Sequence, residues 1–157
     1  MTAYQYAFRT IWEVEADLPR VWELLSDYQY GQWWKGVSAY KVREGSPGNG
    51  IGSVYASIFR TKLPYRLIFL SELVHCEPMR ALEFKAYGEL EGRGAWKLTQ
   101  HGTITRIEYR WQVNTNKSWM NRLAPLLRPL YRWNHRKVMD EGARGFAKKL
   151  GARLVSC

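Results

Sequence analysis

The chain has few cysteines and no long apolar run. Only Cys76 and Cys157 are cysteines among its 157 residues, and they form no zinc or redox spacing. So few cysteines argue against a scaffold held by disulfides and favour a reducing compartment. The sequence opens without a basic segment followed by an apolar one, and its apolar runs are far shorter than a bilayer span. We therefore expect a cytoplasmic protein without a transmembrane helix.

The usual motifs of metal and nucleotide chemistry are also missing. The three histidines are His75, His101 and His135, and no two of them stand at a metal-ligand spacing. There is no Gly-x-Ser-x-Gly sequence and no phosphate-binding loop. We expect neither a metal nor a cofactor.

Acidic residues are outnumbered, because 24 Lys and Arg face 14 Asp and Glu for a net charge of +10. No recognition motif accompanies this charge, so nucleic-acid binding is not favoured. The cations concentrate in the last third of the chain, where a solvated helix face is one explanation. Trp119, Met120, Leu126 and Leu127 lie in the same region. A peripheral contact of this basic region with an anionic membrane therefore stays open as a second explanation.

Periodicity predicts the order of the elements. Apolar residues alternate over 4–14, as in a half-buried strand, and two short helical pieces follow up to residue 34. Turn signals then separate six further strands near 37–44, 51–60, 65–76, 80–89, 93–100 and 103–114. A helical period runs from about 118 to 154, irregular at first because of Pro125 and Pro129, so the continuous helix is predicted to begin near Pro129.

This order predicts a single α+β domain over residues 1–157. A seven-stranded antiparallel sheet with one long helix at its C-terminal end buries its apolar face best by curling around that helix. We expect space between the curved sheet and the helix. Ile68 and Leu70 lie on the predicted outer face, which leaves both a monomer and a homodimer open.

Several segments resemble the polyketide cyclase/dehydrase-like branch of the START-like superfamily, also called the helix-grip or SRPBCC fold. The segments are Trp12–Ala16, Val21–Asp27, Trp33–Val37, Leu63–Leu67, Gly88–Trp96 and Trp133–Met139, with Gly142 and Gly145 after the last. The resemblance implies a helix-grip fold with an internal cavity. Members of this superfamily bind lipids, hormones, pigments and polyketide intermediates, and only some catalyse cyclisation, dehydration or hydrolysis. Binding and catalysis therefore both remain possible outcomes for this chain.

The inward faces of the predicted elements supply the candidate ligand contacts. Glycines at positions 88, 92 and 94 remove side-chain volume from a face that is otherwise apolar and aromatic. The expected wall combines aromatic rings with a few hydroxyl and indole donors, as in pockets for amphiphilic small molecules. The alternative is that the same rings fill the interior. The candidate residues are Trp34, which lies where the resemblance places the mouth of the cavity, together with Tyr55, Tyr65, Leu67, Phe69, Phe84, Trp96, Tyr109, Trp111, Tyr131, His135, Val138, Met139 and Gly142.

His135 is the one histidine on the inward stripe of the long helix, between Tyr131 and Val138. It is interpreted as a buried structural histidine, a ligand contact, or an acid or base oriented by Asn134. The leading hypothesis is a module that sequesters or transports a small hydrophobic, aromatic or lipid-like molecule. The alternatives are a cyclase, aromatase or dehydratase acting on a polyketide-like substrate through His135, and a peripheral membrane protein.

Overall fold

The computed structural model describes residues 5–61, 63, 64 and 66–157. Its elements follow the predicted order, and burial alternates along the strands as the period of two requires. The elements are β1 (Gln5–Glu15), α1 (Leu18–Ser26), the 3₁₀ turn η1 (Tyr30–Gln32), β2 (Val37–Arg43), β3 (Val54–Arg60), β4 (Arg66–Glu77), β5 (Ala81–Gly88), β6 (Leu90–His101), β7 (Ile104–Thr115), α2 (Ser118–Leu150) and β8 (Arg153–Ser156).

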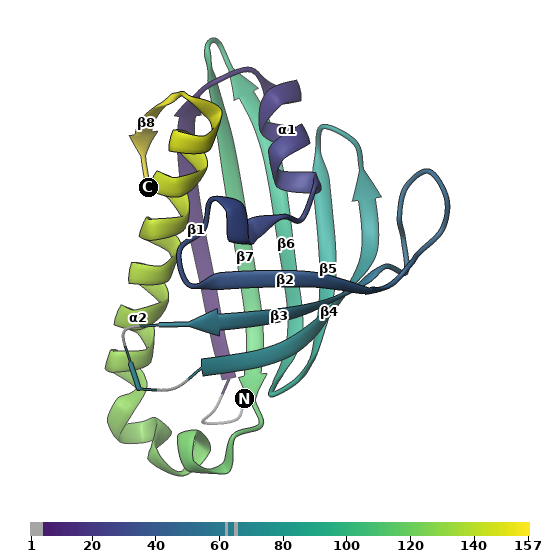
Figure 1. Cartoon of the computed structure of the whole chain (residues 1–157). Coiled ribbons are helices and arrows are strands. Elements are labelled where there is room, and N and C mark those ends of the chain that lie inside the picture. The colour runs from purple at the N-terminus through teal and green to yellow at the C-terminus, as the bar shows by residue number, and fades with distance from the viewer. Residues whose placement is uncertain (1–4, 62, 65) are drawn as a thin grey trace.

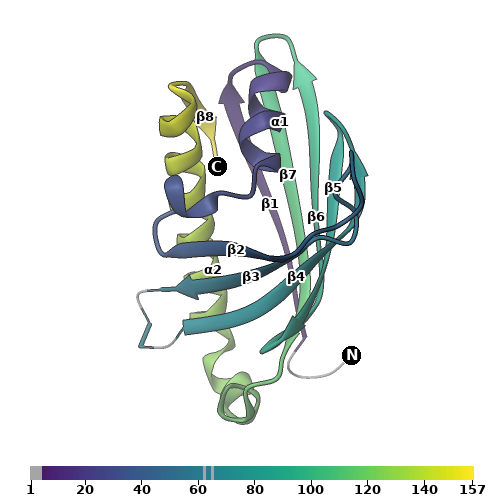
Figure 2. The ribbon, with the colours of Figure 1, turned by 45° about the vertical axis from the view of Figure 1, so that its right-hand side comes forward.

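All the described strands form one antiparallel sheet in the order β2-β3-β4-β5-β6-β7-β1-β8. The strands β2, β3 and β4 cross the long strands β1, β6 and β7 steeply, so the sheet curls around one side of α2 (Figures 1 and 2). Strand twist accumulates into this curl because the apolar face must meet the helix. The α+β helix-grip prediction is confirmed.

The sheet has eight strands, and the predicted number of seven was too low. Gly151 ends α2 with a left-handed backbone (φ 68°), and its amide donates to the Lys148 carbonyl. Such a glycine stops a helix without steric cost. The chain then returns as β8 and pairs with Glu13–Glu15 of β1. The predicted end of the helical period at residue 154 was therefore too late.

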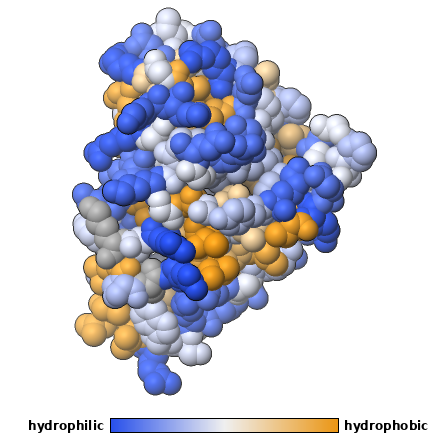
Figure 3. All heavy atoms as spheres, viewed as in Figure 1, coloured by the Kyte–Doolittle hydropathy of each residue, from blue (hydrophilic) through white to orange (hydrophobic). Residues whose placement is uncertain are grey.

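The helix α2 begins at Ser118, so the predicted start near Pro129 was wrong. Proline has no N–H, so Pro125 and Pro129 leave the carbonyls of Asn121 and Pro125 without their helical donors. The helix continues through both prolines but turns at its lower end (Figure 1). Its outer side there is exposed, and hydrophobic side chains gather on the surface over this part of the molecule (Figure 3).

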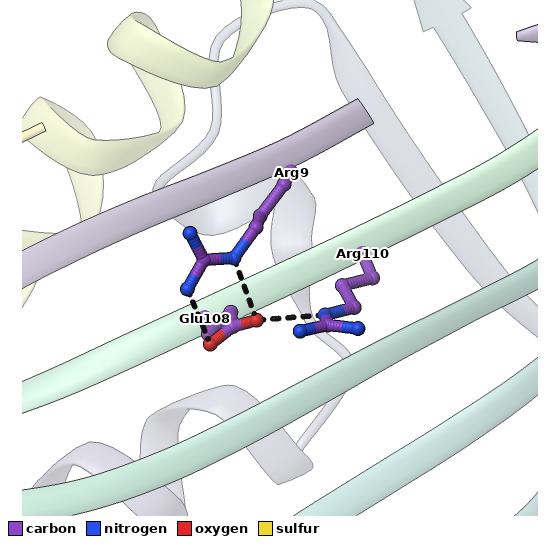
Figure 4. A network of polar contacts seen from close by, with 3 residues as sticks. All are labelled: Arg9, Glu108 and Arg110. Carbon is purple, nitrogen blue, oxygen red and sulfur yellow. Dashed lines mark hydrogen bonds and ion pairs between the residues drawn. The ribbon is translucent and has the colours of Figure 1, made fainter. Parts of the chain in front are cut away.

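The outer face of the sheet carries charged side chains over β1 and β7. Glu108 of β7 accepts hydrogen bonds from the Arg9 guanidinium of β1 (Nε to Oε1, 2.9 Å) and from its own neighbour Arg110 (2.7 Å) (Figure 4). Hydrogen bonds from Arg9 and Arg110 lower the pKa of Glu108 to about 2. Exposed ion pairs contribute at most about 1 kcal/mol each, so this network supports the β1–β7 register without providing the main stability.

The core on the inner face falls into two clusters of buried residues. The larger lies near α1 and the end of α2, where Trp12, Leu25 and Phe146 are almost wholly inaccessible to solvent. The smaller lies near the start of α2 and contains Tyr6, Phe69 and Tyr131, among others. Because the clusters are separate, the interior between them is where a cavity can lie.

Candidate functional site

A cavity of about 150 Å³ lies between the concave face of the sheet and α2. Residues of both core clusters contribute to its wall, so it occupies the gap between them. Its wall is mainly aromatic, and no described lining residue is Asp, Glu, Lys or Arg. The lining residues are Tyr6, Phe8, Tyr28, Tyr30, Trp34, Ala39, Tyr55, Ser57, Phe59, Thr61, Leu67, Phe69, Ser71, Phe84, Leu90, Trp96, Tyr109, Trp111, Val113, Thr115, Met120, Tyr131, Asn134, His135, Val138 and Met139.

A ladder of aromatic rings forms the sheet side of this wall. Trp96 of β6 stacks on its cross-strand partner Tyr109 of β7, with ring centroids 4.1 Å apart. Trp111 follows on the same face of β7, 6.0 Å from Tyr109 and 5.7 Å from Phe69 of β4. Trp111 lies opposite Gly94, where a Cβ would come within 2.9 Å of its ring. A glycine is therefore required beside Trp111, since any side chain would push this ring out of the ladder.

One end of the cavity carries several tyrosines. The rings of Tyr28 and Tyr55 pack 4.4 Å apart, and Tyr30 lies 6.2 Å from Tyr28. Burial raises the pKa of Tyr28, Tyr30, Tyr55 and Tyr109, so all four phenols stay protonated. Within the described part of the chain, the buried Tyr30 hydroxyl has no hydrogen-bond partner. The hydroxyl oxygen is covered by its neighbours, so a ligand oxygen reaches it only when the surrounding side chains move.

The backbone of Tyr28 is left-handed, with φ 61°. This conformation is unfavourable for a bulky residue and costs on the order of 1–3 kcal/mol. Its ring packs against Tyr55 and, at 5.6 Å, against Phe84. The packing of the cavity wall therefore holds this residue in a strained conformation.

On the helix side the wall includes His135 of α2, whose imidazole stacks on the Phe8 ring at 3.8 Å with planes 10° apart. Burial lowers the pKa of His135 to about 4, so its ring is neutral at pH 7. Unlike His75, which contacts Glu77 at 3.2 Å, the His135 ring has an aromatic neighbour as its main contact. Asn134 is buried beside it and also lines the cavity. A neutral imidazole and an amide can exchange hydrogen bonds with a ligand without any charge.

Trp34 closes the helix side of the cavity. The residues before it were expected to be helical from 28 to 34, but only the η1 turn forms. The Trp34 indole N–H donates to the Val138 carbonyl at 2.9 Å, and its ring lies on Gly142, where a Cβ would come within 2.6 Å. Trp33 stacks behind it, at 5.4 Å, and packs on Phe146 in the core.

The structure brings most of the predicted site residues to one cavity. Gly142 is the exception, because Trp34 covers it, and Tyr65 lies outside the described residues. Tyr55 and Ser57 face inward. The sequence alone does not decide this register, because the alternating positions Val54, Ala56 and Ile58 are apolar too. The predicted residues that line the cavity are Trp34, Tyr55, Leu67, Phe69, Phe84, Trp96, Tyr109, Trp111, Tyr131, Asn134, His135, Val138 and Met139.

Sequence reasoning missed several lining residues. Tyr6 and Phe8 share the inward face of β1, and Phe59 continues the phase of Tyr55 and Ser57, so alternation could have identified them. Tyr28 lies between α1 and η1, and Tyr30 begins η1, a single turn that is too short to show a period. Only the path of the chain between α1 and β2 brings them to the cavity.

Residues 5–61, 63, 64 and 66–157 contain neither a metal-binding cluster nor a membrane-spanning helix. No three His, Cys, Asp or Glu side chains in this part of the chain could hold a metal ion together. None of its helices is long and apolar enough to cross a bilayer.

Sequence comparisons give no relative, because neither a protein-family model nor a curated protein matches the chain. Solved structures do match it. The Thermus thermophilus protein TTHA0849 has a TM-score of 0.77 at 18% identity, covering 92% of this chain and 97% of its own. The aromatase/cyclase Zhui from Streptomyces sp. R1128 has a TM-score of 0.74 at 12% identity, covering 94% of both chains.

A START superfamily protein from Mycobacterium smegmatis also matches, with a TM-score of 0.74 at 11% identity over 92% of this chain and 97% of its own. Identities this low establish a shared fold and leave activity open. The predicted resemblance is thus confirmed at the level of architecture. The chain has the START-like helix-grip fold, in the form that polyketide aromatase/cyclases also adopt.

Proposed function

We propose that the protein binds a small, uncharged, mainly aromatic molecule in the cavity, and sequesters or carries it. The observation that carries this proposal is the cavity wall, in which stacked rings surround the space and no described lining residue has a formal charge at pH 7. An ion buried without a partner costs several kcal/mol. Carboxylate and ammonium ligands are therefore disfavoured, and flat neutral molecules are favoured.

The size of the cavity limits the ligand. An apolar cavity of about 150 Å³ admits a molecule the size of benzene, whereas drug-sized ligands occupy roughly 300–1,000 Å³. One aromatic ring with a small substituent fits the present wall. A fused or longer molecule requires half-buried lining side chains such as Leu67 and Trp111 to move.

The tyrosine end indicates which polar group the ligand carries. A buried donor without a partner costs about 1–3 kcal/mol, and a ligand acceptor would recover this free energy. The Tyr30 hydroxyl is such a donor within the described part of the chain. A carbonyl or phenolic oxygen at one end of an otherwise apolar ligand satisfies it without introducing charge.

Displacement of a neutral, single-ring fluorescent dye, 4-(dimethylamino)benzonitrile, tests the proposal, together with native mass spectrometry of the purified protein. Ser57→Leu places extra side-chain volume in the cavity and should abolish dye binding. Ala56→Leu is the matched control, since Ala56 precedes Ser57 in β3 and does not line the cavity. The proposal fails if no compound co-purifies and the dye does not bind, or if Ser57→Leu binds the dye as well as Ala56→Leu does.

A second candidate function is cyclisation, aromatisation or dehydration of a polyketide-like substrate, with His135 transferring the proton. It is favoured by the position of the imidazole in the cavity wall and by the fold shared with Zhui. A base with a pKa of about 4 is weak at neutral pH, so catalysis has less support than binding. If turnover is found, His135→Ala should lower kcat about 10²–10⁴-fold, and a change of only a few-fold would exclude this mechanism.

A further inference from the structure

The first half of α2 has large hydrophobic side chains on its outer side, facing away from the cavity. Their positions alternate by four and three residues, so they form one line along the helix. Their exposed fractions range from 39% at Trp133 to 77% at Leu126. We call them the outer stripe, and they are Trp119, Leu123, Leu126, Leu130 and Trp133. A line of this length is not needed for the core, because the opposite side of the helix already packs there.

The charges around the outer stripe are all of one sign. The helix has no Asp or Glu between residues 118 and 139, and its exposed cations there are Arg122, Arg132, Arg136 and Lys137. The Arg128 guanidinium lies on the inner side instead, 5.3 Å over the Tyr6 ring. The Lys137 ammonium lies 6.0 Å from the Trp133 ring, so charge reaches the end of the stripe. Beyond Lys137 the same side of the helix carries Glu141 and then the exposed Arg144 and Lys148, so its net charge there stays positive. The surface therefore combines an apolar line with cations beside and beyond it.

We propose that the outer stripe docks on the surface of an anionic lipid bilayer. Tryptophan and leucine insert at the boundary between headgroups and acyl chains, while long basic side chains reach the phosphates. Each cation near an anionic surface contributes about 1 kcal/mol, or about fivefold in affinity. A second copy of this chain fits the surface poorly, because pairing two stripes would bring two sets of arginines together.

The inner side of the same helical segment contributes to the cavity wall through Met120 and Tyr131. Docking would thus bring one wall of the cavity next to the lipid. An apolar ligand could then pass between bilayer and cavity without crossing water. Membrane docking itself does not depend on the proposed ligand binding and can be tested separately.

Sedimentation with vesicles tests the docking. The full chain should bind vesicles that contain phosphatidylcholine and phosphatidylserine, and added salt should weaken this binding. Vesicles of phosphatidylcholine alone should bind the chain more weakly. Leu126→Ser removes the most exposed leucine of the stripe and should weaken binding about tenfold. Val42→Ser is the matched control, because Val42 is 58% exposed on β2, and it should bind like the wild type.

Removing charge is the second part of the test. Arg122→Gln combined with Arg136→Gln should weaken binding to the anionic vesicles about 25-fold, at about fivefold for each cation. Absence of binding to anionic vesicles, or equal binding by Leu126→Ser and Val42→Ser, would overturn the proposal. So would a concentration-dependent dimer of the wild type that Leu126→Ser abolishes, since the stripe would then pair with a second copy. Dye binding by the same samples reports on the cavity and should be unchanged in Leu126→Ser.

Discussion

Burial determines what His135 can do. Its imidazole stacks on Phe8 among apolar neighbours, and this environment lowers its pKa to about 4. A histidine in the unfolded chain titrates near a pKa of about 6.5, so between these two values the unfolded state binds the extra proton. The free energy of unfolding therefore decreases as the pH falls through this window. Above the window His135 does not lower it.

We expect the free energy of unfolding to fall by about 3 kcal/mol between pH 7 and pH 4 because of His135 alone. His135→Phe keeps a ring on Phe8 without a titratable group, so its stability should depend less on pH in this window by that amount. Urea unfolding of both proteins at several pH values measures the difference. His101→Gln, a change at the exposed end of β6, is the control and should leave the wild-type slope. Identical pH profiles for His135→Phe and the wild type would contradict the burial of this group.

Gly142 matters because it has no side chain. Glycine in a helix interior costs about 1 kcal/mol relative to alanine. The Trp34 ring occupies the place of its side chain, and the indole N–H donates to the Val138 carbonyl one turn away. The glycine is therefore explained by contact with Trp34, where the sequence had indicated contact with a ligand.

Gly142→Ala should destabilise the protein by about 2 kcal/mol, because the new methyl group overpacks the Trp34 site. In a Trp34→Leu background the same change should be neutral or stabilising, since helix propensity then dominates. Urea midpoints of the four proteins form a double-mutant cycle that isolates the coupling. Equal effects of Gly142→Ala in both backgrounds would show that the two residues are independent.

At the scale of elements, α2 consists of two halves with different support. The half from Ser118 to Leu130 contains both prolines and exposes its outer stripe to solvent. The half that ends at Leu150 packs Ala143, Phe146 and Ala147 into the larger core cluster. Local opening is easiest where hydrogen bonds are missing and few apolar contacts form.

Amide hydrogens of residues 119–130 should therefore exchange at least about tenfold faster than those of 139–150, equivalent to ~1.4 kcal/mol of local stability. Hydrogen exchange followed by mass spectrometry measures both peptides in one experiment. Pro129→Ala restores one helical donor and should slow exchange in the first half. Uniform protection along α2 would mean that the prolines do not weaken the helix.

At the scale of the whole molecule, the curled sheet and the helix enclose a space that neither element could form alone. The wall of that space has aromatic faces, protonated phenols and a neutral imidazole. Ligand charge should thus decide binding more strongly than ligand shape does.

Acetophenone and benzoate test this selectivity, because they are similar in size and differ in charge. Acetophenone should raise the Tm more as its concentration increases, because at ten times its Kd it adds about 1.4 kcal/mol to the free energy of unfolding. Benzoate should leave the Tm unchanged. Thermal unfolding of the wild type and of Ser57→Leu provides the measurement, and the filled variant should respond to neither compound. Stabilisation by benzoate as strong as that by acetophenone would contradict an uncharged site.

The periodicities determined much of this protein without a structure. Alternation over seven strands and a helical period after residue 118 were sufficient for the helix-grip arrangement, because burial of one sheet face against one helix leaves few architectures. The same periods identified twelve of the residues that line the cavity, among them Trp96, Tyr109 and His135, whereas Trp34 was predicted from the resemblance. The line of exposed apolar residues on α2 is also visible in the sequence by its spacing.

Tertiary structure alone decided the rest. Tyr28 and Tyr30 reach the cavity through a non-periodic connection. Gly142 lies under Trp34, which is more than a hundred positions earlier in the chain. The strand β8 forms because β1 has a free edge beside Gly151. These features depend on contacts between residues far apart in the chain. Local sequence determines which side of an element is apolar, but only packing determines whether two apolar sides meet, leave a gap or exclude each other.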